Sequence, residues 1–164
     1  MRLIDSDGFG VELSVAGYQF PDHIDPRIRY GWLVIAGVAN CPEGNWSFRW
    51  QALTLDESVE LADWLKRIAA EADGDDAPVP GPARLTFSEP NLGFTATRGA
   101  GAVELAIALD LEFLPPWDRR TDEGSPFVVT ARLAPADIAT AAKELGAEVD
   151  GYLPPGGRLP GRGW

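Results

Sequence analysis

The chain has 164 residues, of which 45% are hydrophobic and 24% charged, the size and composition of a single globular domain. Twenty-five acids against fourteen lysines and arginines give a formal net charge of −11, which disfavours nucleic-acid backbones and anionic membranes as partners. No apolar run is long enough for a membrane span or a signal peptide, and a single cysteine excludes an intrachain disulfide. We therefore expect a soluble cytoplasmic domain that favours a basic partner.

The first half of the chain has the pattern of consecutive strands. Apolar and polar side chains alternate over residues 11–15, the period of a half-buried strand. Gly31–Ala39 is apolar on both faces, as a central strand is, and Trp46–Gln51 alternates aromatic with polar residues. The segment Asn40–Asn45, which contains a proline and a glycine, is predicted to be the hairpin loop between these two strands.

A helical period follows. Thr54 and Glu57 have the spacing of a capping box, in which each side chain hydrogen-bonds the backbone N–H of the other residue. Apolar residues then recur at helical spacing as far as Ala69, with acids on the opposite face. We predict a helix from this box to about Ala72, followed by a mobile surface loop over 73–83, because its three prolines prevent a helix from continuing.

The second half returns to strands and ends in another helix. Four strands are predicted, at Arg84–Ser88, Leu92–Thr97, Val103–Phe113 and Phe127–Leu133, with a charged loop at 118–126. A final helix is expected from Pro135, a favoured first helical position, to about Val149. The Gly- and Pro-rich residues 151–164 are predicted to be a loosely attached tail.

These elements predict an α+β fold. Because strands follow one another without interleaved helices, we expect a curved antiparallel sheet of seven or eight strands. One helix follows the first group of strands and another ends the domain. The expected organisation is therefore a single domain over residues 1–150, with the tail after it.

Residues for chemistry are few. His23 is the only histidine and lies in a proline-rich turn, where a structural role is the commoner one, and pairing it with Cys41 as a catalytic dyad has no motif to support it. Segments that begin like a calcium-binding loop or a glycine-rich phosphate loop lack the residues that these motifs require at their later positions. We therefore expect no enzyme, no metal and no cofactor. A hydrolase with paired carboxylates stays an alternative that only the abundance of acids supports, as does a structural role in a larger assembly.

A row of aromatic residues gives a further alternative. Trp46, Phe48 and Trp50 lie on one face of the same predicted strand, where the commoner arrangement is a buried core. An exposed row could instead stack on a sugar, so the alternative function is a small-ligand or carbohydrate-binding module. Trp117 follows two prolines at a strand end and is the best candidate for an exposed aromatic.

Several fragments in series resemble one bacterial family, the WapI family immunity proteins. They are Gly17–Pro21, Trp32–Val34, Trp46–Phe48, Glu60–Leu65, Phe87–Phe94 and Pro115–Trp117. They stand in the family's order and cover roughly residues 2–150. The resemblance implies a small protein that protects its producer by binding and neutralising the toxic C-terminal domain of a polymorphic toxin, often a nuclease. The resemblance supplies no contact residues.

The contact surface is predicted from charge and exposure. The strongest local excess of acids lies in residues 54–76, and charge complementarity with a basic toxin would speed association. The predicted electrostatic surface consists of Asp56, Glu60, Asp63, Asp73, Asp75 and Asp76. Glu89, Asn91 and Trp117, at the ends of loops, are predicted as specific anchors, because binding energy concentrates in few residues. For each of them, a solvated face or turn chemistry is the alternative.

Overall fold

The structure is a computed structural model of the whole chain, and it describes residues 1–72, 81–99, 101–118 and 125–154. The predicted contact residues Asp73, Asp75 and Asp76 lie outside these ranges, as do most of the predicted loop and most of the predicted tail. Within these ranges, none of the helices has the length and apolarity needed to cross a membrane.

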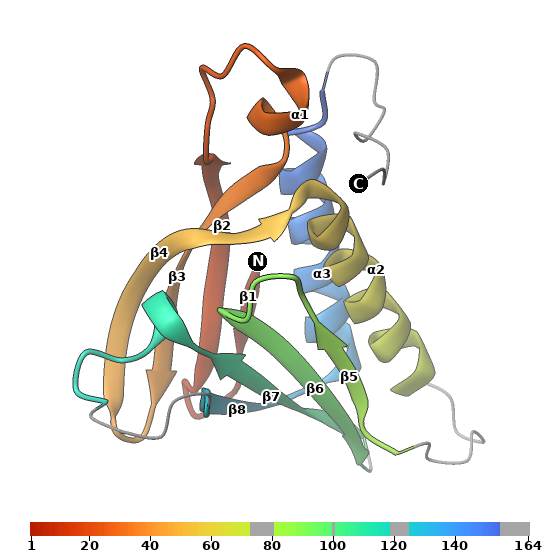
Figure 1. The fold of residues 1–164 in the computed structure, drawn as a ribbon. Coiled ribbons are helices and arrows are strands. Elements are labelled where there is room, and N and C mark those ends of the chain that lie inside the picture. Colours follow the sequence, from red (N-terminus) through yellow and green to blue (C-terminus); the bar gives the residue numbers. More distant parts are fainter. Residues whose placement is uncertain (73–80, 100, 119–124, 155–164) are drawn as a thin grey trace.

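The fold is α+β, as predicted (Figure 1). Its strands are β1 (Arg2–Ile4), β2 (Gly10–Tyr18), β3 (Trp32–Cys41), β4 (Gly44–Thr54), β5 (Ala83–Thr86), β6 (Leu92–Gly99), β7 (Ala102–Leu109) and β8 (Phe127–Leu133). Its helices are α1 (Pro26–Arg29), α2 (Leu55–Ala72), α3 (Pro135–Asp150) and the 3-10 turn η1 (Leu111–Phe113).

The prediction of a single sheet is wrong. In the described residues, the strands form two four-stranded antiparallel sheets with the orders β1-β2-β3-β4 and β5-β6-β7-β8. We call them the first sheet and the second sheet. Helix α2 lies between β4 and β5 in the chain and separates the two groups. Apolar alternation shows which face of a strand is buried but not which strand pairs with it, so the sequence could not distinguish one sheet from two.

The core lies between the inner faces of the two sheets and the helix pair α2–α3, which lies along one side of the molecule (Figure 1). Phe48 of the first sheet packs on Phe113 of η1 with ring centroids 4.2 Å apart. Trp64 of α2 packs on Phe94 of the second sheet, with centroids 6.1 Å apart. Each layer therefore buries large rings against another, and the layers share one core.

The capping box predicted before α2 is formed. The Glu57 carboxylate accepts from Thr54 N at 2.8 Å, and Thr54 Oγ1 accepts from Glu57 N at 3.2 Å. The two long helices match their predicted ranges within about one residue. The sequence predicts these helix boundaries because apolar periodicity and capping residues are local properties of the chain.

The predicted strand Val103–Phe113 is too long. The ladder with β6 and β8 ends at Leu109, and the next residue, Asp110, accepts from Leu111 N at 2.8 Å through Oδ1. Leu111 has φ +52°, which bends the chain into η1 although the apolar alternation continues. A capping aspartate therefore ended the strand where hydrophobicity did not.

Helix α3 completes the edge of β2 beyond the end of β1. The N–H of Val15 donates to Glu148 Oε1 at 2.8 Å, and the Tyr152 hydroxyl donates to the Val15 carbonyl at 2.9 Å. The Tyr18 hydroxyl donates to the Tyr152 carbonyl in turn. The end of α3 thus satisfies backbone groups that a neighbouring strand would otherwise pair.

Candidate partner-binding surface

Charge is divided between the helices and the strands. Helices α2 and α3 carry nine acids and three bases, whereas the strands β1 to β8 of the described residues carry two acids and five arginines. The helical acids are Asp56, Glu57, Glu60, Asp63, Glu71, Asp137, Glu144, Glu148 and Asp150, and the strand arginines are Arg2, Arg49, Arg84, Arg98 and Arg132. The negative charge therefore lies on the helices and in the loops.

Three of the predicted contact residues lie on the first turns of α2. Glu60 and Asp63 are exposed, because they occupy the face of α2 opposite its buried apolar stripe. Asp56 is half-buried, and its Oδ1 is buried without a hydrogen-bond partner in the described part of the chain. Glu60 and Asp63 are thus the acids that α2 offers most openly to a partner.

A fourth predicted residue, Glu89, follows Ser88, which is hydrogen-bonded to the start of α2. Ser88 N donates to Glu57 Oε1 at 2.7 Å, which ties the β5–β6 turn to the start of α2. Burial raises the pKa of Glu57, but hydrogen bonds from Thr54 and Ser88 outweigh it, and the pKa lies below its ordinary value. Glu57 is therefore held ionised and in place, and half-buried Glu89 follows directly after the tethered Ser88.

Asn91 is not available at the surface. Its side chain is buried, with 1% exposure, and donates to Glu112 Oε2 at 2.8 Å. Its backbone carbonyl accepts from Asp110 N at 3.0 Å. Asn91 therefore fixes the turn into β6 to the capping residue of η1, and its buried side chain offers almost no surface to a partner.

Trp117 lies apart from the acids. It is 40% exposed, and its ring meets Trp46 edge to face with centroids 5.4 Å apart. The same ring covers Gly44, where an added Cβ would lie 3.0 Å from it. Gly44 and α2 are at opposite ends of β4, separated by about 33 Å of extended strand. Trp117 and the α2 acids thus do not form one compact site.

The aromatic row of β4 divides into a buried part and an exposed part. Trp46 and Phe48 are each 6% exposed, whereas Trp50 is 48% exposed. Trp46 is covered by Phe127 as well as by Trp117, and Phe48 by Phe113, but those rings cover only the first half of β4. Core placement is confirmed for Trp46 and Phe48 and wrong for Trp50. The alternation of aromatic and polar residues correctly predicts which face of β4 points inward. It does not predict how far along the strand other rings cover that face.

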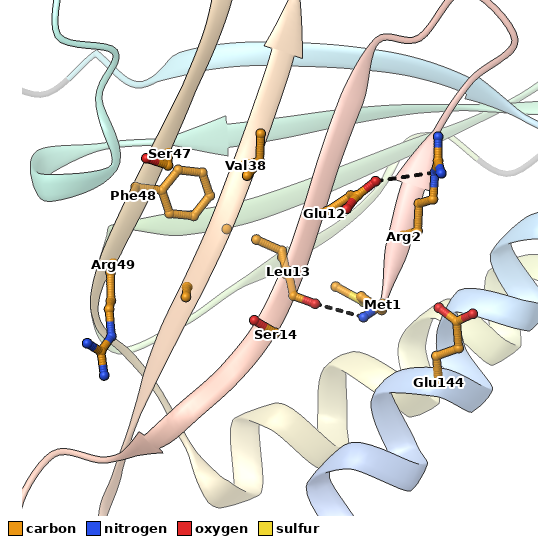
Figure 2. A pocket seen from close by; sticks show the side chains of 12 residues that line it. Met1, Arg2, Glu12, Leu13, Ser14, Val38, Ser47, Phe48, Arg49 and Glu144 are labelled. Atoms are coloured by element: carbon orange, nitrogen blue, oxygen red, sulfur yellow. Dashed lines mark hydrogen bonds and ion pairs between the residues drawn. The ribbon is translucent and has the colours of Figure 1, made fainter.

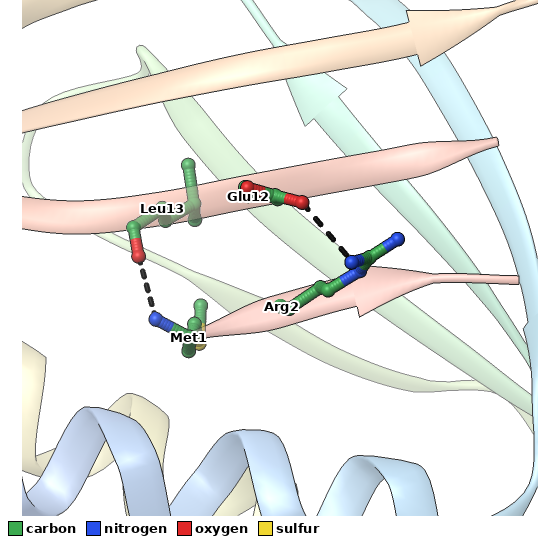
Figure 3. A network of polar contacts seen from close by, with 4 residues as sticks. All are labelled: Met1, Arg2, Glu12 and Leu13. Atoms are coloured by element: carbon green, nitrogen blue, oxygen red, sulfur yellow. Dashed lines mark hydrogen bonds and ion pairs between the residues drawn. The ribbon is translucent and has the colours of Figure 1, made fainter. Parts of the chain in front are cut away.

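The outer face of the first sheet carries an open hollow of about 710 Å³ (Figure 2). Small outward side chains form its floor, because Ser14 pairs with Ala36 and Val38 with Ser47 across the strands. The lining also includes Arg49 on β4, Arg2, Glu12 and Glu144. At one edge of it, Arg2 pairs with Glu12 at 3.5 Å, and Met1 N donates to the Leu13 carbonyl at 2.7 Å (Figure 3).

The candidate catalytic residues are separated. His23 accepts from Asp25 N at 3.0 Å through Nδ1 and forms part of the turn that precedes α1. Cys41 lies at the far end of β3, ten residues of strand away, and burial, followed by its hydrogen bond to Glu43, raises the pKa of its thiol. No group of three or more histidine, cysteine or acidic side chains suited to a metal ion occurs among the residues the structure describes.

Comparison with known proteins places most of the chain in one family. The family model described as "Immunity protein WapI-like family" matches residues 2–153, a range that runs from β1 to just beyond α3. No curated protein matches the chain. The family match is the one that the fragments in the sequence predicted.

Proposed function

Because the chain belongs to the WapI-like immunity protein family, we propose that it binds the toxic domain of a cognate bacterial toxin and neutralises it. Immunity proteins generally act without catalysing a reaction, so the proposed mechanism is stoichiometric. The bound protein covers the toxin's active surface or blocks access of its substrate. A cytoplasmic nuclease toxin fits best, because its basic substrate-binding surface would be complementary to acids.

The observation that carries the proposal is the group of acids on and beside α2. Glu60 and Asp63 project from α2, with Asp56 beside them and Glu89 held close by the bond between Ser88 and Glu57. The proposed electrostatic surface also includes Asp73, Asp75 and Asp76, which follow α2 in the sequence. Such a surface steers a basic partner into contact and can raise its association rate about 10–10³-fold.

The direct test measures binding of the purified chain to the toxin domain encoded beside it. We expect a one-to-one complex whose association rate falls as salt is added, and rescue of growth when the two are co-expressed. A chain that neither binds nor protects against that domain would refute the proposal.

A matched pair of variants locates the surface. Glu60→Lys with Asp63→Lys should lower the association rate by about tenfold or more at low salt, because two acids facing the partner become bases. The control, Glu104→Lys with Asp150→Lys, makes the same change in net charge at two exposed acids elsewhere and should leave most of that rate intact. Equal losses in the two variants would show that only net charge matters.

The ligand-binding alternative loses its main support. Two of the three rings in the proposed stacking row are buried in the core, so the row presents only Trp50 to a sugar. Contact with the toxin therefore explains the exposure of Trp50 and Trp117 better than sugar binding does.

A further inference from the structure

The last strand of the first sheet has an open edge. β4 is paired only with β3 in the described part of the chain, and it is the outermost strand of its sheet (Figure 1). It has 11 residues, against 3 and 4 in the edge strands β1 and β5 and 7 in β8. An edge of this length presents a row of unpaired backbone N–H and C=O groups, which natural sheets commonly shorten or cover.

The open part of this edge is its middle. The first rings of the strand are covered by η1 and the Trp117 segment, and the indole of Trp46 donates to the Phe113 carbonyl at 2.9 Å. At the other end, Ala52 and Leu53 are buried. Between these ends, residues Ser47–Gln51 are exposed or half-buried except for Phe48.

Two side chains of the kinds that dominate protein interfaces stand in that open part. Trp50 is 48% exposed on the inner face, and Arg49 is exposed on the outer face, where it lines the hollow. Arg2 and Arg98 each pair with a glutamate, whereas Arg49 has no ion pair among the described residues. The edge therefore offers an unpaired cation on one face and a large apolar ring on the other.

We propose that an extended segment of the toxin domain adds to the edge of β4 as a further strand of the first sheet. Successive side chains of such a segment point to opposite faces, so an apolar residue would cover Trp50 and an acidic residue would pair with Arg49 at the hollow. The main-chain hydrogen bonds supply affinity, and these two contacts supply specificity. This inference rests on the proposed function and names where the toxin is held.

Continuity with the acidic surface supports this occupant. β4 ends at Thr54 and α2 begins at Leu55, so only a short buried stretch separates the open part of the edge from Asp56 and Glu60. One protein partner can therefore place a basic surface on α2 and a strand along β4. The two contacts have different charge requirements, since α2 calls for basic residues and Arg49 for an acidic one.

Hydrogen exchange of backbone amides in the complex tests strand addition directly. The probe is the adjacent toxin domain, inactivated in its own active site, bound to the full chain. We expect those amides of residues 47–51 that point away from β3 to exchange at least tenfold more slowly in the complex. Binding with unchanged exchange over 47–51 overturns the strand addition and leaves the proposed function standing, whereas absence of binding refutes both.

Two variants with matched controls test the side chains. Trp50→Ala and Arg49→Glu should each weaken the complex by about 30-fold, the loss expected of an interface hot spot. The controls are Val128→Ala, a 50% exposed apolar residue on β8, and Arg84→Glu, an exposed strand arginine on β5. Equal affinities of the β4 variants and their controls would overturn the assignment of Trp50 and Arg49, even if the edge is protected.

Discussion

The helices and the strands of this protein divide its surface between opposite charges. The helix pair carries nine acids and three bases, whereas the strands carry five arginines and two glutamates. The net charge of −11 is therefore not an evenly spread property of the chain. A partner attracted only by the net charge would not distinguish the two regions. A partner with complementary charges would bind the acids on α2 through basic residues and the arginine on β4 through an acidic residue.

The comparison extends to what the acids do. Glu57 and Glu148 are held by backbone donors and join elements together, whereas Glu60 and Asp63 are exposed on the solvent face of α2. Acids of the same helices therefore either hold the fold together or lie exposed, where the proposed interaction would use them. Stability measurements should separate these groups.

The largest effect is expected at the contact between η1 and the first sheet. Phe113→Ala should lower the free energy of unfolding by about 3–5 kcal/mol, because it leaves a cavity against Phe48 in the core. Leu111→Ala, two residues earlier and 51% exposed, should change it by less than about 0.5 kcal/mol. Urea denaturation measures both, and similar losses would show that η1 acts as a unit rather than through one ring.

The helix cap gives the next effect. Glu57→Gln should lower stability by about 1–2 kcal/mol at neutral pH, because an amide cannot accept from both Thr54 N and Ser88 N as a carboxylate does. Glu60→Gln, on the exposed face of α2, is the control and should be nearly neutral.

The cap also predicts how this difference depends on pH. Because the pKa of folded Glu57 lies below its ordinary value of 4.5, its contribution is fully present above that value. The contribution is lost as the pH falls through the lower, folded pKa. Urea midpoints of wild type and Glu57→Gln should therefore converge in acid, and a gap that widens there would contradict the assigned hydrogen bonds.

A smaller effect is expected where α3 meets β2. Tyr152→Phe should cost about 1 kcal/mol, because the Val15 carbonyl loses its donor while the ring contact with Tyr18 remains. Tyr30→Phe keeps the matching ring contact with Tyr18 and serves as the control. Thermal denaturation of the two variants checks this, and identical shifts would rule out a specific role for the Tyr152 hydroxyl.

The smallest effects on stability should come from the exposed acids themselves. Glu60→Lys on α2 and Glu104→Lys on β7 should each change the free energy of unfolding by less than about 0.5 kcal/mol. Because both variants should fold normally, a difference in toxin binding between Glu60→Lys and Glu104→Lys would come from a direct effect on the interface. A large loss of stability in Glu60→Lys would remove that residue from the interaction surface.

Much of the fold could be predicted because it depends on local signals. The Thr54–Glu57 box and the apolar stripe after it set α2, and Pro135 marks the start of α3. The division into two sheets depends on which strands pair, and a burial pattern carries no such information. β1 and α1 escaped prediction because three and four residues are too few to show a period.

The candidate site was harder to predict for the same physical reason. Asn91 has the composition of an exposed turn, but the capped strand end at Asp110 and Glu112 surrounds it. Trp50 has the alternation of a core residue, but the rings that cover Trp46 and Phe48 stop short of it. Whether a side chain is covered depends on segments far away in the chain, which a local pattern does not reveal.

The bonds between Val15 and the end of α3 have a consequence for synthesis of the chain. Val15 meets Glu148 across 133 residues of sequence and Tyr152 across 137. As the ribosome releases the N-terminal strands first, β2 leaves the exit tunnel long before the groups that complete its edge. A nascent chain stopped before Glu148 would therefore leave this edge of β2 without the groups that complete it.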